Sequence, residues 1–187
     1  VHYVRVAMED VHGRAGVTPR HGFSSIVYAC RPQSRGHVGL YDAKVDSPPA
    51  LYPNYFSVEQ DLIDTRNGFR ETRRVFLQKA FDEYRGAQLK PPQDINIDDD
   101  DELDAWIRQT GETLYHPVGT CKMGQDQMAV VDAQGSVHGL LGLRVVDASL
   151  MPTLIAGNTN APTIMLAEKI SDAILGKKAL APEAQIS

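Results

Sequence analysis

The stretch "YHPVGTCKMG", residues 115–124, differs in character from the strongly patterned segments around it. A proline, two glycines and few residues that favour a helix or a strand predict an irregular loop. The loop carries His116, and an unperturbed imidazole, with a pKa of about 6.5, is mostly the free base at neutral pH. His116 is therefore a candidate general base for a hydroxyl proton, although a loop histidine is more often an ordinary hydrogen-bonded surface residue.

A second irregular segment, "AGNTNAPT" at residues 156–163, runs into a helix expected over 162–175 and stopped by Gly176. Asn158 and Asn160 precede Pro162, so the unpaired N–H groups of the first helical turn point outward. Such a helix start can hold a phosphate, a carboxylate or an anion that forms during a reaction. The simpler alternative is that Asn160 is only the N-cap.

Two earlier helices are predicted from the spacing of apolar residues. The first begins at a capping box of Ser57 and Gln60 and continues to about Arg85, with Gly68 as an expected point of interruption. The second covers about 101–110 and follows four consecutive aspartates. Because a calcium loop needs oxygen ligands at alternate positions, we interpret these aspartates as a solvated helix start.

The remaining apolar segments alternate in the manner of strands, between turns rich in glycine and proline. We therefore predict an α+β fold, a mostly antiparallel sheet with helices packed on one face. The expected strands lie near 1–8, 23–30 and 36–41, and in "AVVDAQGSVHG" and "LRVVDASLMP", where Asp132 to Gly135 form a type I turn.

Composition excludes several classes of function. With 187 residues, 42% of them hydrophobic, and a formal net charge of −5, the chain predicts a soluble globular protein that does not bind nucleic acid. No apolar run reaches the length of a membrane span. Cys30 and Cys121 are expected to be free thiols, and no metal site is predicted, since His116 and Cys121 are the only close soft pair. A thiol enzyme built on Cys121 remains an alternative, although no third group accompanies the pair.

Three motifs in fixed order carry a family resemblance: "YHPVGTCKMG", "AVVDAQGSVHGLLGLRVVDASLMP" and "GNTNAPTIMLAEKISDAI". Together they resemble the carboxy-terminal region of the glucose-methanol-choline (GMC) family of flavin-dependent oxidoreductases. With "RPQSRGHVGLYDAKVDSPPALYPNYFS" upstream, the resemblance covers about residues 30–175. It is closest to the alcohol dehydrogenase (acceptor) and choline dehydrogenase members.

The resemblance implies a cofactor and a set of site residues. FAD would accept the hydride, and His116, in the family's HPVGT motif, would remove the hydroxyl proton of the alcohol. Asn158 matches the second catalytic position and could donate a hydrogen bond to the developing alkoxide. Asp147, Ala148, Thr159 and Asn160 would approach the flavin, and the start of the last helix could stabilise negative charge on it.

The chain contains no G-x-G-x-x-G turn for the FAD pyrophosphate. We therefore expect residues 1–187, which begin without methionine, to be the substrate-binding domain of a larger flavoenzyme, with a frayed tail at 177–187. Such a domain lacks the FAD-binding Rossmann half, so FAD would be bound mainly by an amino-terminal domain outside this chain. The chain alone is predicted to be inactive.

Substrate, partners and location stay open at this level. An aliphatic primary alcohol is the first choice of substrate and choline the second, while a non-catalytic binding module is an alternative from another class. The expected partners are the small alcohol and the protein's own FAD-binding domain, with the electron acceptor unassigned. Self-association could cover the exposed docking surface. We expect a cytoplasmic protein, with peripheral attachment at the inner membrane as an option for the full-length form.

Overall fold

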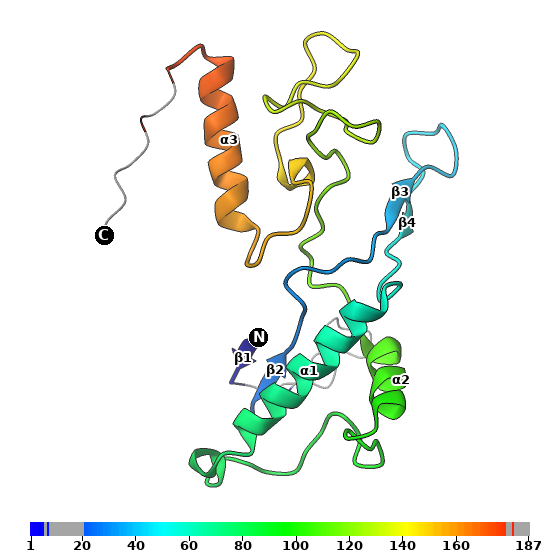
Figure 1. Ribbon diagram of the computed structural model, residues 1–187, viewed down its shortest axis with the longest axis vertical. Helices are drawn as coiled ribbons and strands as arrows, with labels where there is room; N and C mark the ends of the chain where they lie inside the picture. Colours follow the sequence, from blue (N-terminus) through cyan, green and yellow to red (C-terminus); the bar gives the residue numbers. More distant parts are fainter. Residues whose placement is uncertain (6, 8–20, 179–180, 182–187) are drawn as a thin grey trace. The chain divides into compact units, whose positions relative to one another are not determined.

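A computed structural model describes residues 1–5, 7, 21–178 and 181, and these form two compact units (Figure 1). Unit 1 comprises Val1–Gly36 and Tyr52–Glu112, and unit 2 comprises His37–Leu51 and Thr113–Ser187. Each unit has its own small hydrophobic core. The described residues form four short strands and three α-helices, so the chain mixes α and β structure.

The core of unit 1 lies between α1 (Glu59–Phe76) and α2 (Asp100–Thr110). Leu62 of α1 packs with Leu103 and Ile107 of α2, and all three side chains are buried. Phe69 and Trp106 extend this contact, with their ring centroids 5.6 Å apart. Apolar burial on the facing sides of the two helices therefore fixes their pairing.

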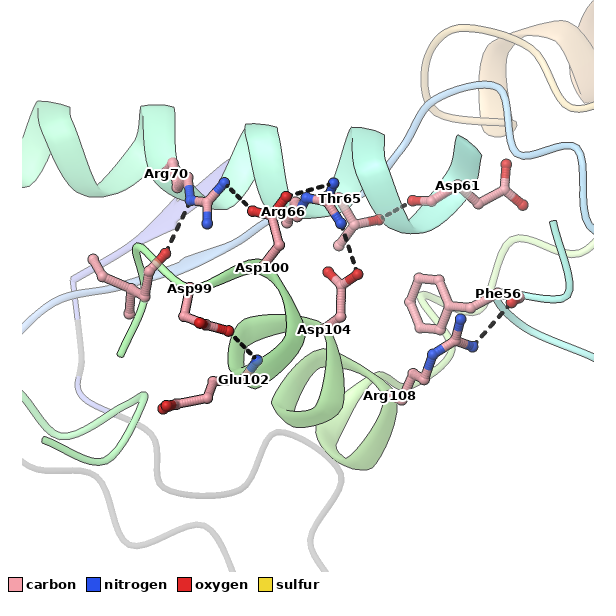
Figure 2. A network of polar contacts seen from close by, with 11 residues as sticks. Phe56, Asp61, Thr65, Arg66, Arg70, Asp99, Asp100, Glu102, Asp104 and Arg108 are labelled. Carbon is pink, nitrogen blue, oxygen red and sulfur yellow. Dashed lines mark hydrogen bonds and ion pairs between the residues drawn. The ribbon is translucent and has the colours of Figure 1, made fainter. Parts of the chain in front are cut away.

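Ion pairs surround this core on the side where α1 faces the start of α2 (Figure 2). Arg66 of α1 lies 2.9 Å from a carboxylate oxygen of Asp100 and 2.7 Å from one of Asp104. Arg70 contacts Asp100 at 2.7 Å. The aspartate run thus supplies partners for α1 as well as a helix start, because carboxylates in a first turn also complement the helix dipole.

The bounds of α2 confirm the prediction for this segment. Asp99 is the N-cap, and its side chain accepts a hydrogen bond from the N–H of Glu102. Gly111 is the C-cap, and its N–H donates to the carbonyl of Ile107 at 2.7 Å. Both ends are closed by neighbouring residues, which is why local sequence predicts them well.

The predictions for α1 were wrong at both ends and at Gly68. The N-cap is Val58, without a side-chain cap, and Gln60 donates to Asp64 in place of a capping box with Ser57. The helix ends at Phe76, and the guanidinium of Arg85 donates to its carbonyl at 2.8 Å. An aromatic cluster accounts for this early end. Phe81, in the short 3₁₀ turn η1 (Lys79–Phe81), folds back onto Phe76. Phe23 and Tyr3 also pack on Phe76.

Gly68 does not interrupt α1. A Cβ atom at this position would lie 3.0 Å from Cγ1 of Val27, so the absent side chain lets the segment after β2 pack closely against the middle of the helix. β1 (His2–Val4) and β2 (Ser24–Ile26) form an antiparallel pair next to α1. The glycine therefore serves tertiary packing at a cost in helix propensity.

The strands form two separate two-stranded sheets, so the prediction of one main sheet was wrong. β3 (His37–Gly39) pairs with β4 (Ala50–Tyr52), a strand that the sequence did not predict. Prolines at 48, 49 and 53 flank β4 and suggested irregular structure. The three residues between them are not prolines, so each has a backbone N–H group that can take part in strand pairing. Parts of the predicted strand 1–8 and tail 177–187 lie outside the described residues.

In the described residues, unit 2 contains β3, most of β4, the helix α3 (Asn160–Ile174) and long irregular segments. Its core contains Val131, Leu150 and Ile170. The two strands predicted in 129–152 were wrong. The two segments meet through a single bridge between Ser136 and Arg144, and Val131 bridges Val137 within the first segment. The predicted turn at Asp132 is present, since the N–H of Gly135 donates to the Asp132 carbonyl at 3.0 Å.

The end of α3 follows the prediction. Leu175 is the C-cap and Gly176, with a φ of +67°, turns the chain out of the helix. In the described part of the chain, no helix has the length and apolar character to cross a membrane.

Candidate active site

The loop that carries His116 is anchored by backbone hydrogen bonds to the segment just before residue 152. The N–H of Cys121 donates to the carbonyl of Ser149 at 3.2 Å, and that of Met123 donates to the carbonyl of Leu150 at 2.9 Å. Leu150 is fully buried, so the loop is tied to the core of unit 2. An irregular segment thereby gains a defined position without being a strand.

Gly119 lets this loop lie close to its anchor. Its φ is +86°, a left-handed conformation, and a Cβ atom there would stand 3.3 Å from the carbonyl oxygen of Met151. A side chain would therefore be opposed both by the backbone conformation and by the neighbour. The glycine of the HPVGT motif is explained by this close approach.

The residue before His116 has an unusual backbone conformation. Tyr115 has a φ of +63°, which is uncommon for a residue other than glycine. Its N–H donates to Oγ1 of Thr113 at 3.0 Å, which helps to hold the turn. Residues in such conformations persist where surrounding contacts determine them, and they are enriched at functional sites.

His116 is joined to the start of α3. Its Nδ1 atom lies 2.9 Å from Oγ1 of Thr159, across a sequence separation of 43 residues. The ring is exposed, whereas Thr159 is only 7% exposed. Among the described residues, the Thr159 hydroxyl is the one polar group in hydrogen-bonding contact with the ring. The second ring nitrogen, Nε2, is therefore left for an external partner.

Thr159 immediately precedes α3, and this rules out the simpler alternative in which Asn160 is only the N-cap. Thr159 is the N-cap residue, but its side chain makes no capping hydrogen bond. Its carbonyl instead accepts from both the N–H and the hydroxyl of Thr163, at 3.0 and 2.6 Å. The Thr159 backbone has helical angles, φ −78° and ψ −11°, which differ from the extended conformation of a side-chain N-cap. Its hydroxyl is directed to His116.

The other predicted residues of this segment point to solvent. Asn158 and Asn160 are exposed. Among the described residues, no acceptor takes a hydrogen bond from the N–H of Asn160 or Ala161, and Pro162 has no N–H. These amide and N–H donors fit an anionic group such as a flavin that gains charge on reduction. No hydrogen bond joins Asn158 to His116 within the described residues.

Asp147 and Ala148 lie in a second 3₁₀ turn, η2 (Ala148–Leu150), for which Asp147 is the N-cap. The Asp147 carboxylate accepts from the N–H of Ser149 at 2.8 Å and from its hydroxyl. This carboxylate thus holds the turn to which the His116 loop is anchored. A purely structural role accounts for its observed contacts.

Sequence reasoning missed the partnership of Thr159 with His116 and the anchoring role of Thr163. Thr163 follows Thr159 by four residues at a helix start, a local signal that could have indicated its back-bonding. No local signal could indicate the contact with His116, because the two segments are far apart in the chain. In the described residues, Cys30 and Cys121 are free, and no group of three metal-ligating side chains is gathered.

A model of the GMC oxidoreductase family matches residues 32–167. The chain belongs to this family. GMC oxidoreductases are FAD-dependent enzymes, and the predicted family is confirmed. The fit to the family covers the His116 loop, the η2 turn and the first half of α3.

Curated relatives of this GMC chain are oxygen-dependent choline dehydrogenases. That of Escherichia coli O127:H6 is 47% identical over 179 residues, which are 96% of this chain and 32% of the relative. That of Chromohalobacter salexigens is 46% identical over 185 residues, or 99% of this chain and 32% of the relative. The chain therefore spans about a third of the length of the curated relatives it matches.

Solved GMC structures share the fold. Pyridoxine 4-oxidase from Mesorbium loti superposes with a TM-score of 0.72 at 30% identity, covering 80% of this chain and 29% of that protein. A fungal aryl-alcohol oxidase superposes with a TM-score of 0.70 at 28% identity, covering 79% of this chain and 24% of that protein. Both comparisons support the substrate-domain fold for this part of the chain.

Proposed function

We propose that the full-length protein is an FAD-dependent oxidoreductase acting on an alcohol CH–OH group, and that residues 1–187 are its substrate-binding domain. One observation carries the proposal: the exposed ring of His116 is tethered through Nδ1 to Thr159, at the start of α3. A ring held on one side and open on the other suits a general base.

In this proposal His116 takes the hydroxyl proton of the bound alcohol at Nε2. Negative charge then develops on the substrate oxygen, which makes the adjacent C–H bond a better hydride donor. The amide of Asn158 donates a hydrogen bond to that oxygen and helps to orient it. FAD, when bound, supplies the acceptor for the hydride.

Four further residues would face the cofactor: Asp147, Ala148, Thr159 and Asn160. The open N–H groups at the start of α3 support this role for the 158–160 segment, because they are donors without acceptors among the described residues. Asp147 would act through its turn, since its carboxylate is engaged with Ser149. Most of the cofactor would be bound by a separate amino-terminal domain.

The exposed side of α3 supports docking on such a domain. Ile164, Met165, Ile174 and Leu175 are each more than half exposed, at 55, 54, 53 and 66%. Apolar side chains gathered on one helix favour a partner surface over water. Self-association of the chain and a cytoplasmic location stay predictions.

For the substrate, the curated relatives favour choline over the aliphatic primary alcohol suggested by the motifs. These relatives are oxygen-dependent choline dehydrogenases, and they are 46 to 48% identical over nearly the whole chain. We therefore propose choline as the first substrate to test and an aliphatic primary alcohol as the second. The electron acceptor is left unassigned.

The test is His116→Ala in the full-length protein, assayed by reduction of an artificial acceptor with choline and with a primary alcohol. We expect kcat/KM to fall by about 10²-fold or more with the better substrate, since that is the usual contribution of a general base. His138→Ala is the matched control, because His138 is also exposed in unit 2 and its ring Nε2 lies 3.0 Å from the Gly124 carbonyl oxygen.

The control should retain activity within about threefold of the parent. A His116→Ala variant that also stays within about threefold would exclude the general-base role. Cys121→Ser, assayed in parallel, should have a small effect, whereas loss of activity would favour a thiol enzyme.

A further inference from the structure

The hydrogen bond between His116 and Thr159 bears on which tautomer the imidazole adopts. A neutral imidazole carries its proton on one nitrogen and a lone pair on the other. The Thr159 hydroxyl can either accept from a protonated Nδ1 or donate to an unprotonated one, and both arrangements satisfy the 2.9 Å contact. The two arrangements have opposite consequences for Nε2.

Only one tautomer leaves Nε2 able to take a proton. If Thr159 accepts from Nδ1–H, the lone pair lies on Nε2, on the side of the ring away from Thr159. If Thr159 donates to Nδ1, Nε2 already carries a proton and is only a donor. A base at this site therefore requires the hydroxyl oxygen as an acceptor.

The surroundings of Thr159 favour a fixed role for its side chain. The residue is 7% exposed, and its carbonyl is held twice by Thr163, so the backbone that carries the hydroxyl is restrained. Its backbone is helical, so its hydroxyl does not cap α3, and that hydroxyl lies 2.9 Å from Nδ1 of His116. The side chain is thus committed to the imidazole.

We propose that Thr159 is a positioning residue that accepts a hydrogen bond from Nδ1–H of His116 and so keeps Nε2 as the nitrogen that receives the substrate proton. The proposal rests on the proposed function of His116 as a general base. It differs from the expectation that the Thr159 side chain binds the cofactor. Proton balance is simple: the hydroxyl proton moves to Nε2, while Nδ1 keeps its own.

The test compares Thr159→Val with Thr159→Ser in the full-length enzyme, with kcat/KM measured against pH. Valine removes the hydroxyl at nearly constant shape, and we expect kcat/KM to fall about tenfold, as for the loss of one hydrogen bond to a charged group. Serine retains the hydroxyl and should restore activity to within about threefold. FAD content and thermal unfolding check that both variants fold.

The direction of the pH shift separates positioning from a general structural effect. An accepting hydroxyl oxygen favours the positively charged ring, because the charged ring is the stronger donor. Its removal should therefore move the acid limb of the kcat/KM profile to lower pH in Thr159→Val. A limb that moves to higher pH, or does not move, would overturn the proposal.

A second measurement needs no variant at residue 159. In the full-length parent labelled with ¹⁵N in the histidine ring, the His116 signals can be assigned by their loss in His116→Gln. At a pH where the ring is neutral, we expect a protonated Nδ1 and an unprotonated Nε2, and the opposite pattern contradicts the proposal. If His116→Ala itself keeps parental activity, the proposed function fails; if only Thr159→Val matches the parent, the positioning role alone fails.

Discussion

Unit 1 and unit 2 are stabilised by different kinds of interaction. In unit 1, α1 and α2 bury Leu62, Leu103 and Ile107 between them, and arginine side chains pair with aspartates at the edge. In unit 2, most of the chain outside α3 is irregular and is held by hydrogen bonds between loop backbones. In its described residues the buried core consists of Val131, Leu150 and Ile170, and partly buried side chains of the loops pack against it.

This difference between the units determines where the chain can place reactive side chains. Regular helices satisfy their own backbone and leave the side chains to pack, whereas a loop needs external anchors but can aim a side chain freely. In unit 2 those anchors are the η2 turn and the start of α3, and His116 contacts the latter. Comparable changes in the two units should therefore have different effects on activity.

The largest effect on stability is expected from truncation of a core leucine. Leu103 in unit 1 and Leu150 in unit 2 are both 0% exposed, so Leu→Ala at either should lower the free energy of unfolding by about 2–5 kcal/mol. Urea unfolding of the full-length variants measures this loss.

The two leucine variants should differ in activity. Leu150 supports the turn that accepts the Met123 N–H, so Leu150→Ala should also lower kcat/KM of the folded enzyme by about tenfold or more, through misplacement of the His116 loop. Leu103→Ala should leave kcat/KM of the folded fraction unchanged. Equal losses in both variants would contradict the division of roles between the units.

The next largest effect on the free energy of unfolding is expected from a substitution of Asp61 in unit 1. Its buried carboxylate accepts from the N–H groups of Gln33 and Ser34, each at 2.7 Å. Burial raises the pKa of Asp61, but the hydrogen bonds from Gln33 and Ser34 and the charge of Arg35 outweigh it and lower the pKa below the ordinary value. Asp61→Asn should cost about 1.5–3 kcal/mol at neutral pH.

The lowered pKa also sets the pH dependence of stability. A carboxyl group with a folded pKa below its unfolded value stabilises the fold above about pH 4, and this contribution is lost as the pH falls through the folded pKa. Parent stability should therefore decline below about pH 4 more steeply than that of Asp61→Asn. Asp64→Asn, at an exposed position of α1, is the control and should change stability by less than about 0.5 kcal/mol.

The smallest effect on stability is expected at two glycines of unit 2 with left-handed backbones. Gly119 and Gly139 have φ values of +86° and +76°, so Gly→Ala at either should cost about 1–2 kcal/mol. The two positions differ in their surroundings. A Cβ at Gly119 meets the Met151 carbonyl at 3.3 Å, whereas one at Gly139 meets no atom within 4 Å.

The two variants should differ in kcat/KM, because only the Cβ added at Gly119 would meet a neighbouring atom. Gly119→Ala must displace the loop from its anchor and should lower kcat/KM by about tenfold or more. Gly139→Ala should leave kcat/KM within about threefold of the parent. If both variants kept parental kcat/KM, the close approach at Gly119 would have no role in placing His116.

Local sequence predicted those elements whose boundaries are set by neighbouring residues. Asp99 and Gly111 close α2, Gly176 ends α3, and Asp132 makes its own turn. The ordered motifs also predicted the GMC family and pointed to His116 and the 158–160 segment, which the structure brings together at one contact. The catalytic and cofactor roles of these residues stay predictions.

Tertiary contacts decided the features that local sequence predicted wrongly. α1 ends early because Phe81 packs on Phe76. Gly68 lies within the helix, and its lack of a side chain leaves space for Val27 after β2. Thr159, and not Asn160, is the N-cap, and its hydroxyl is directed to a ring 43 residues away. Local sequence was enough to indicate the family, the turns at glycine and proline, and the types of reactive residue, because each of these depends on neighbouring residues or on short motifs. The folded chain alone decided which residues meet, because contacts between distant segments depend on the packing of the whole unit.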